Sequence, residues 1–165
     1  LYNRRYLMDT MAAEFARARR YWTPMAIMMI DVDHFKLVND RYGHQVGDQV
    51  LEHMGRILRE RTRQSDIAAR YGGEEFIVLL PMTSAKQAYS LAERIRHKVA
   101  SLRVPSEKGE VSITLSIGVV ELSHNARKEN PEHIFRRADI AMYAAKASGR
   151  NCTVILDIET PNHHA

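Results

Sequence analysis

The sequence has 165 residues, of which 45% are apolar, and its 24 basic and 20 acidic residues give a formal net charge of +4. This length and composition suit one compact domain with a sizeable core. The single cysteine, Cys152, excludes an internal disulfide framework and a cysteine-rich metal site. No apolar run is long enough to span a membrane, and the first residues lack the pattern of a signal peptide. We therefore expect a soluble domain in a reducing compartment, the cytoplasm.

The first half of the chain predicts two helices separated by a strand. Residues 1–22 carry apolar side chains three and four positions apart, which is typical of a long helix. Residues 25–33 form an apolar run that ends abruptly in charge, as a buried strand does at the edge of a sheet. A second helix is expected from Val46 to about Arg61, because its apolar residues again recur on one face.

A hairpin and a third helix are expected next. Two short apolar runs, residues 67–71 and 76–80, lie on either side of Gly72 and Gly73. Glycine tolerates the backbone angles of a tight turn, so the two runs predict a β-hairpin. Ser84 to Gln87 match a capping box, which predicts the start of the third helix.

The last third of the chain completes the fold prediction. Residues 111–120 alternate between apolar and other side chains, so they predict a strand. Asn130 and Pro131 predict the start of a final helix that Gly149 ends, and residues 152–156 predict a closing strand. From the first strand onward the order is β-α-β-β-α-β. This order predicts an α+β, ferredoxin-like fold, an antiparallel sheet with helices packed on one face, plus an extra N-terminal helix and a C-terminal strand.

Acidic residues are expected to meet at one edge of this sheet. Asp31 ends the first strand, and Glu74 and Glu75 lie in the hairpin turn. Carboxylates at a sheet edge suit Mg²⁺, which takes one or two protein carboxylates and otherwise binds water and substrate phosphates. Acidic side chains in turns are also commonly just solvated. The pattern alone leaves both interpretations open.

Four motifs occur in the same chain: DVDHFKLVNDRYGHQVGDQVL, RYGGEEF, TLSIGV and ADIAMYAAKASGRN. In this order and spacing they resemble the GGDEF family of diguanylate cyclases. The resemblance implies a palm-type fold over residues 1–157, followed by a tail at 158–165. It also implies an enzyme that joins two GTP molecules into cyclic di-GMP and releases two pyrophosphates.

The sequence departs from the family pattern at two points. In the GGEEF signature, residues 72–76, Glu74 replaces the aspartate of GGDEF, a variant that is frequent among active members. No D-x-L-T-G stretch precedes Leu1, so we expect the chain to be part of a longer protein with an N-terminal sensor or dimerisation region. Whether that protein is tethered to a membrane is left open.

The resemblance implies a metal site with Mg²⁺, for which Mn²⁺ could substitute. Asp31 and Glu74 are the implied ligands, together with the carbonyl group of Val32. Two metal ions can activate the attacking 3′-hydroxyl group and neutralise charge on the triphosphate. Glu75 is implied to be catalytic, either at the second metal ion or as the group that removes the hydroxyl proton. Asp33 has two interpretations, a metal role or the N-cap of a short helix.

Six residues are implied to bind GTP, in three pairs. The backbone at Phe35 and Lys36 is expected to hold the β- and γ-phosphates. Asn39 and Asp48 are implied to recognise guanine, and a buried Asp48 would accept the N1 and N2 protons that adenine lacks. Lys146 and Arg150 are implied triphosphate ligands.

Lys146 and Arg150 also have an alternative interpretation. Because they are four residues apart at the end of the last predicted helix, they can point in the same direction. Without the resemblance, a charged last turn that complements the helix dipole would be the simpler explanation. The resemblance further implies that catalysis requires a homodimer, since each domain holds only one GTP.

Arg63 and Asp66 form an R-x-x-D pair upstream of the signature that resembles the product-binding inhibitory site of the family. An arginine can grip phosphate or guanine, and a carboxylate can accept guanine N–H groups. Arg94 matches the second arginine of that site. The alternative is an exposed ion pair at a helix end. We expect noncompetitive inhibition by an intercalated cyclic di-GMP dimer.

Two other functions compete with an active cyclase. One is a catalytically inactive binding module, but such members usually break the signature, the metal aspartate or the phosphate lysine, and all of these are intact here. The other is nucleic-acid binding, which is disfavoured because no basic stripe interleaved with aromatic residues is present.

Overall fold

The structure, a computed structural model, describes residues 1–122 and 129–156; the predicted tail at 158–165 lies outside these residues. The described elements are α1 (Arg4–Tyr21), β1 (Met25–Val32), α2 (Phe35–Tyr42), α3 (His44–Arg61), β2 (Ile67–Arg70), β3 (Glu75–Pro81), α4 (Ala85–Ala100), β4 (Val104–Ser106), β5 (Gly109–Val111), β6 (Leu115–Glu121), α5 (Pro131–Ala147) and β7 (Cys152–Ile155). The helices expected from apolar periodicity are confirmed, within two residues at most ends.

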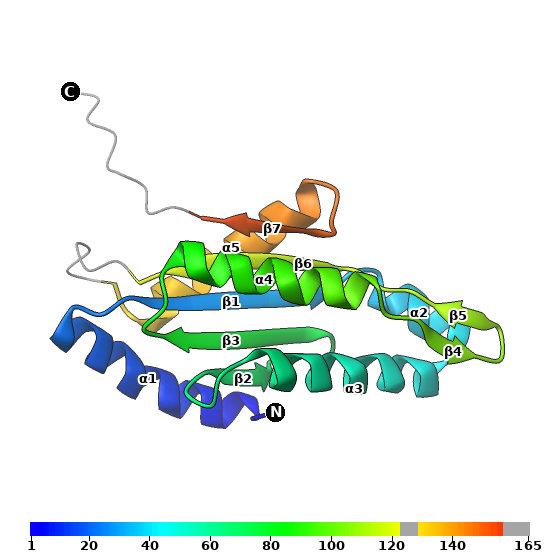
Figure 1. Cartoon of the computed structure of the whole chain (residues 1–165), viewed down its shortest axis with the longest axis horizontal. Coiled ribbons are helices and arrows are strands. Elements are labelled where there is room, and N and C mark those ends of the chain that lie inside the picture. Colours follow the sequence, from blue (N-terminus) through cyan, green and yellow to red (C-terminus); the bar gives the residue numbers. More distant parts are fainter. Residues whose placement is uncertain (123–128, 157–165) are drawn as a thin grey trace.

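The main sheet has the strand order β2-β3-β1-β6-β7 (Figure 1). Strand β1 lies in its centre and pairs antiparallel with both β3 and β6, while β2 pairs antiparallel with β3. This is the order of a ferredoxin-like sheet, so the predicted α+β fold is confirmed. The closing strand β7 differs from the rest because it pairs parallel with β6.

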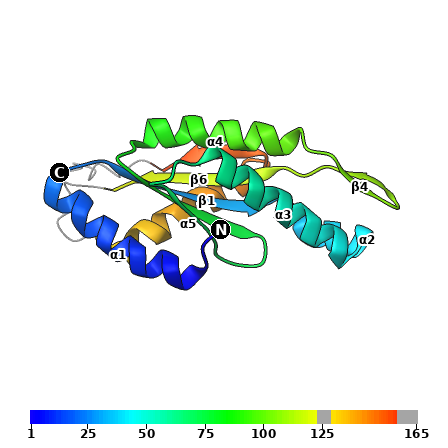
Figure 2. The ribbon, with the colours of Figure 1, turned by 60° about the horizontal axis from the view of Figure 1, so that its bottom comes forward.

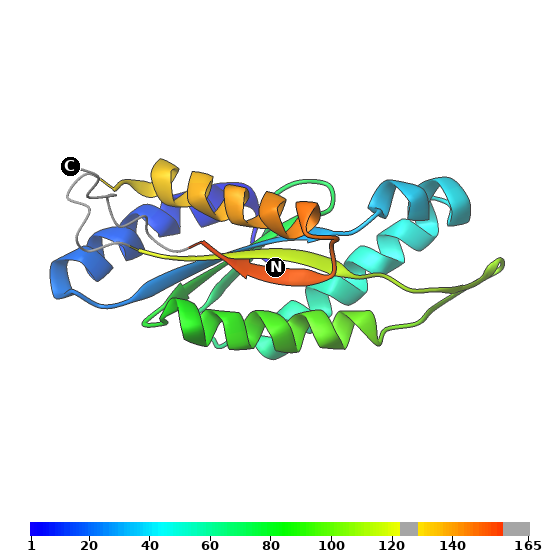
Figure 3. The same ribbon diagram turned by 90° about the horizontal axis from the view of Figure 1, so that it is seen from above.

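Helices cover both faces of the sheet, so the expectation of helices on one face is wrong. Figure 3 shows α1 and α5 on one side and α3 and α4 on the other. Each side has its own cluster of buried apolar side chains. The reason is visible in β1, where all eight residues are buried, because a strand that is apolar on both faces must be covered on both.

The strand predicted at residues 111–120 is divided in two. Its first part, β5, pairs with β4 in a separate hairpin, and β6 begins only at Leu115. Figures 1 and 2 show this hairpin extending past the end of the sheet near α2. Lys108 joins the two, since its Nζ donates to the backbone oxygen of Arg41 at 3.1 Å. The alternating apolar residues nevertheless share one face, because Val111, Ile113 and Leu115 belong to the same core cluster.

Side-chain caps fix the starts of three helices. Asn3 accepts a hydrogen bond from the backbone of Tyr6, and Asn130 accepts one from His133. Ser84 and Gln87 form both hydrogen bonds of the predicted capping box.

One glycine sets how closely α5 approaches the sheet. A Cβ atom at Gly118 on β6 would lie 2.3 Å from the backbone nitrogen of Met142 and 2.5 Å from the oxygen of Ala138. The backbone of α5 therefore rests directly on β6.

Within the described residues, we find no helix long and apolar enough to cross a membrane.

Candidate active site

The acidic end of the sheet forms where β1 ends and β3 begins. Asp31 is 4% exposed and is the direct cross-strand partner of Glu75. The backbone of Val32 donates to the oxygen of Glu74 at 3.2 Å, which extends the pairing to the next residue. The predicted meeting of these acids at one edge is therefore present. Lys146 reaches them from α5, and its Nζ donates to Asp31 Oδ2 at 2.9 Å.

The charges at this end perturb one another. Burial raises the pKa of Asp31, although the hydrogen bond from Lys146 opposes the shift. Burial also raises the pKa of Glu75, and the nearby carboxylates of Asp31 and Asp139 raise it further. For Lys146, burial lowers the pKa, but the contact with Asp31 outweighs this effect and raises it. Several carboxylates thus lie close together with one partly buried cation between them, an arrangement that favours binding of further positive charge.

The signature turn, residues 72–75, is held by Arg70, a residue that the sequence interpretation missed. Arg70 Nε donates to the carbonyl oxygen of Gly72 at 3.3 Å, and its Nη2 donates to that of Gly73 at 2.7 Å. Neither glycine has a positive φ, so the explanation that the turn needs glycine angles is wrong. A Cβ at Gly73 would meet no described atom within 4 Å. The space beside this backbone is open to a ligand, which is a better reason for glycine here.

Asp33 is not the N-cap of α2, so that interpretation is wrong. The residue that caps α2 is His34, without a side-chain hydrogen bond in the described structure. Asp33 is instead buried and accepts hydrogen bonds from the hydroxyl groups of Ser116 at 2.6 Å and Thr114 at 2.7 Å. It also accepts the backbone N–H of Asn151 at 3.0 Å, so it ties three segments together.

Most of the predicted nucleotide residues line one cavity. A cavity of about 460 Å³ lies between α2, α3 and the signature turn, and its lining includes Phe35, Lys36, Asn39, Asp48 and Glu74. This volume is within the range of small-molecule sites. The Asn39 side chain lies against Gly47, where a Cβ would be 1.9 Å from its Oδ1. Glycine at this position therefore permits the predicted guanine contact.

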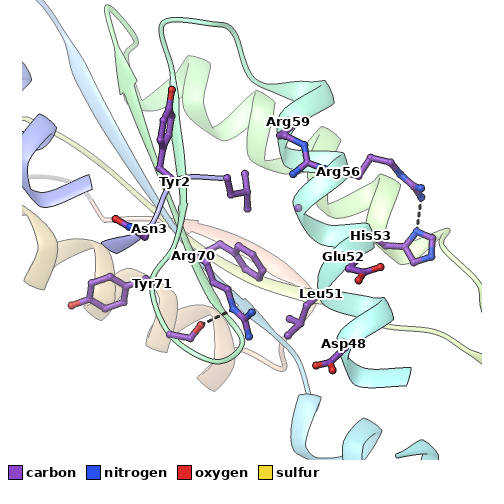
Figure 4. Close-up of a pocket in the computed structure, with 14 residues that line it drawn as sticks. Tyr2, Asn3, Asp48, Leu51, Glu52, His53, Arg56, Arg59, Arg70 and Tyr71 are labelled. Atoms are coloured by element: carbon purple, nitrogen blue, oxygen red, sulfur yellow. Dashed lines mark hydrogen bonds between the residues drawn. The ribbon is translucent and has the colours of Figure 1, made fainter. Parts of the chain in front are cut away.

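Asp48 is exposed, so the expectation of a buried carboxylate is wrong for the protein alone. It lies on the first turns of α3, where the helix faces open cavities rather than the core. One of these is a neighbouring cavity of about 1060 Å³ that shares Asp48, Leu51 and Arg70 with the smaller one. In Figure 4, Asp48 and Leu51 lie on α3 across from Arg70. Asp48 would become buried only when a ligand occupies the cavity.

Lys146 and Arg150 do not share a helix. Helix α5 ends at Ala147, and Arg150 lies beyond it with φ of 64°. Its backbone N–H donates to the oxygen of Ala145 at 3.1 Å, which turns the chain back over the helix end. Arg150 is still close enough to Asp31 to lower the pKa of that carboxyl group. Both basic residues therefore lie close to Asp31, Lys146 from the last turn of α5 and Arg150 from the turn that follows it.

The R-x-x-D pair lies at the opposite end of the sheet. Arg63 Nε is 3.5 Å from Asp66 Oδ2, and its Nη2 donates to Thr83 at 2.8 Å. Asp66 is buried and Arg63 is exposed, so the pair is not simply an exposed one. Asp66 Oδ1 has no hydrogen-bond partner in the described structure. Arg94 is exposed on α4.

Residues 1–152 match the family model described as diguanylate cyclase, GGDEF domain. The chain belongs to the GGDEF family.

Individual relatives agree with this assignment. The probable diguanylate cyclase DgcT of Escherichia coli (strain K12) is 42% identical over 160 residues, which is 96% of this chain and 34% of that protein. The GGDEF domain of DgcB from Caulobacter crescentus, solved in complex with c-di-GMP, has a TM-score of 0.89 at 34% identity, covering 94% of this chain and 91% of that one. The active GGEEF domain of a diguanylate cyclase from Vibrio cholerae has a TM-score of 0.87 at 39% identity, covering 96% and 99%. The chain spans about a third of the length of DgcT.

The acidic end fits a divalent metal ion of the Mg²⁺ type. Within the described residues no group of three or more His, Cys, Asp or Glu side chains is placed to hold a metal ion. Mg²⁺ does not need such a group, because it binds through one or two carboxylates and completes its shell with water and phosphate. Asp31, which is buried, and Glu74 and Glu75, which are half-buried, offer the hard carboxylate oxygens that it prefers.

Proposed function

We propose that this GGDEF domain condenses two GTP molecules into cyclic di-GMP, and that the reaction is a Mg²⁺-dependent attack of each 3′-hydroxyl group on an α-phosphate across a homodimer. The observation that carries the proposal is the convergence of Asp31, Glu75 and Lys146 beside a cavity lined by Asn39 and Asp48. Family membership supports the reaction class.

The residues of the acidic end have separable roles in this proposal. Asp31 and Glu74, with the carbonyl group of Val32, would hold the metal ions, which supply a Lewis acid at the phosphates. Lys146 and Arg150 bind the triphosphate and offset its charge. Glu75 is suited to accept the 3′-hydroxyl proton, because its raised pKa makes it a stronger base than an ordinary carboxylate.

The cavity gives the proposal its base specificity. Asn39 and Asp48 can pair with the Watson–Crick edge of guanine, and Asp48 accepts the N1 and N2 protons. The amides at the start of α2, around Phe35 and Lys36, offer donors for the β- and γ-phosphates. Adenine would leave Asp48 without donors, so we expect GTP to be preferred over ATP.

The homodimer is part of the proposal because each domain is proposed to bind one GTP. One cavity with one acidic end accommodates one GTP, whereas cyclic di-GMP contains two nucleotides joined head to tail. Two domains must therefore present their nucleotides to each other in antiparallel orientation. An N-terminal sensor or dimerisation region outside this chain would control that encounter.

We also propose that the product binds at Arg63 and Asp66, with Arg94 of another domain closing the site, and inhibits the enzyme noncompetitively. The guanidinium group of Arg63 is exposed and can reach a phosphate or a guanine. The unpartnered oxygen of buried Asp66 suits a ligand with N–H donors. The DgcB domain solved in complex with c-di-GMP supports the ligand class.

The test is to incubate the purified domain with GTP and Mg²⁺ and to separate the products by chromatography. We expect cyclic di-GMP and pyrophosphate from GTP, far less product from ATP, and none after chelation of the metal. Specific activity should rise with protein concentration, because the productive species is a dimer. Binding of GTP without any cyclic di-GMP, at any concentration, would instead identify a catalytically inactive binding module.

A further inference from the structure

The turn between α5 and β7 has an unusual backbone. Gly149, Arg150 and Asn151 are consecutive residues with positive φ, at 108°, 64° and 46°. This left-handed conformation is easy for glycine, tolerated by asparagine and unfavourable for arginine. Contacts around the turn are therefore needed to hold Arg150 in it.

Two side chains from distant segments hold Asn151. The carboxylate of Asp33, the residue just after β1, accepts the backbone N–H of Asn151 at 3.0 Å. The guanidinium group of Arg96, on α4, donates from Nη1 to Asn151 Oδ1 at 2.8 Å. Asn151 is thus fixed through both its backbone and its side chain.

Arg96 is itself fixed in place. It forms an ion pair and hydrogen bonds with Glu93 one turn earlier on α4, and Glu93 Oε2 also accepts the hydroxyl group of Thr153 on β7 at 3.3 Å. The hydrogen bond from Arg96 lowers the pKa of Glu93, so Glu93 is ionised at neutral pH. The Arg96 side chain is only 13% exposed. Helix α4 and strand β7 are therefore connected through these charged groups to the turn that carries Arg150.

We propose that Arg96, held by Glu93, is a positioning residue that directs Arg150 toward the triphosphate by fixing Asn151. The inference rests on the proposed role of Arg150 as a triphosphate ligand. Arg96 does not belong to the acidic end itself, because it reaches the turn from α4, on the opposite face of the sheet from α5 (Figure 3). An exposed arginine on a loose turn loses conformational entropy when it binds phosphate, and a turn fixed in advance reduces that loss.

The test is a double-mutant cycle on nucleotide affinity. The ligand is a GTP analogue with a methylene group between the α- and β-phosphates, which binds but cannot react, and calorimetry measures its affinity in the presence of Mg²⁺. We expect Arg150→Ala to weaken binding about tenfold and Arg96→Ala to weaken it about fivefold. The double variant should bind no more weakly than Arg150→Ala alone, because Arg96 acts through Arg150.

Three further measurements separate positioning from a general structural role. GMP, which lacks the β- and γ-phosphates, should bind Arg96→Ala as it binds the wild type. Asn151→Gly keeps the positive φ but removes the Oδ1 acceptor, so it should match Arg96→Ala. Lys98→Ala changes an exposed basic residue on the same helix and should change nothing. Thermal melts establish that each variant is folded.

The inference is overturned if the losses from Arg96→Ala and Arg150→Ala multiply in the double variant, or if GMP affinity falls as far as analogue affinity. Unchanged analogue affinity in both Arg96→Ala and Asn151→Gly, with a loss in Arg150→Ala, would overturn the inference alone. Unchanged affinity in Arg150→Ala would overturn the assignment of Arg150 as a triphosphate ligand and the inference with it. Cyclic di-GMP synthesis by the wild type tests the reaction separately.

Discussion

The two ends of the sheet each hold a buried aspartate beside one basic side chain. Asp31 lies near the C-terminal end of β1, whereas Asp66 lies just before β2. Because both strands run antiparallel to β3, these residues lie at opposite ends of the sheet. Asp31 has Lys146 as its partner and Glu75 opposite it, with Asp139 near Glu75, while Asp66 has Arg63 and one oxygen without a partner in the described structure.

The difference lies in what each site lacks. The acidic end carries more carboxylates than cations, so it lacks positive charge and suits a metal ion with a triphosphate. At the Arg63–Asp66 end, the charges are paired and what is missing is a hydrogen-bond donor, which suits a guanine base beside a phosphate. In the proposed function, an aspartate would therefore serve two different ligands according to its neighbours.

Removing one carboxylate from the acidic end should have the largest effect. We expect Glu74→Gln to lower cyclic di-GMP synthesis about 1000-fold or more, because a neutral amide holds Mg²⁺ poorly and metal ions contribute several kcal/mol to such reactions. Product formation measured by chromatography checks this, with circular dichroism to establish the fold. Glu110→Gln, an exposed acid on β5, is the matched control and should react normally. Near-normal turnover in Glu74→Gln would disprove the metal assignment.

At the other end, Arg63→Ala should affect product binding and not synthesis. We expect the affinity for cyclic di-GMP to fall about 100-fold, since charge-assisted bonds to phosphate and guanine are lost. Initial rates of synthesis, measured before product accumulates, should stay unchanged. Titration calorimetry with cyclic di-GMP is the measurement, and Arg61→Ala, an exposed arginine two residues away, is the control. Equal affinities in wild type and Arg63→Ala would reduce the pair to a simple ion pair.

Metal and nucleotide binding at the acidic end should also depend on pH, in a range above that of ordinary carboxyl groups. The pKa values of Asp31 and Glu75 are raised, so these groups take up protons at a higher pH than ordinary carboxyl groups, whose pKa is about 4. We expect affinity for Mg²⁺ with the GTP analogue to fall as the pH decreases through these raised values. Binding should release protons, which calorimetry in buffers of different ionisation enthalpy detects. A proton release of zero down to about pH 5 would contradict the prediction.

The smallest expected effect is a gain in stability. In the metal-free domain, ionised Glu75 is disfavoured by burial and by Asp31 and Asp139. Its folded pKa lies above the unfolded one, so the charged form costs stability at neutral pH, and the cost disappears as the pH falls below the unfolded pKa. Glu75→Gln should therefore raise the melting temperature by about 2 °C at pH 7 and less at pH 4. Calorimetric melts check this, and a lower melting temperature at pH 7 would show that Glu75 is stabilising.

Much of the fold followed from apolar spacing. The residues that alternate from Val111 to Val119 do share one core, and the caps at Ser84 and Asn130 do begin helices. The two-sided packing was missed, although the unbroken apolar run from Met25 to Ile30 already indicated it. The β4–β5 hairpin was missed because its strands have only three residues each, too short for a periodic signal.

Positions of site residues that belong to a motif could be predicted, whereas contacts between residues far apart in the sequence could not. Asp31, Glu75 and Lys146 converge as the pattern and the resemblance implied. The N-cap interpretation of Asp33 was wrong, because its partners Ser116 and Asn151 are more than eighty residues away in the sequence and could not be foreseen. Arg70 went unnoticed because its role depends on the path of a turn, and sequence spacing does not describe that path.

Because of the close contact at Gly118, the size of the residue at this position determines where α5 lies relative to the acidic end. Met142, whose backbone nitrogen touches the space where a Cβ would lie, is four residues before Lys146 on the same helix. Any larger residue at position 118 would lift α5 and carry the ammonium group of Lys146 away from Asp31. In a saturation-mutagenesis screen for cyclase activity, a position with no part in the chemistry would therefore tolerate almost no substitution, as if it were a catalytic residue.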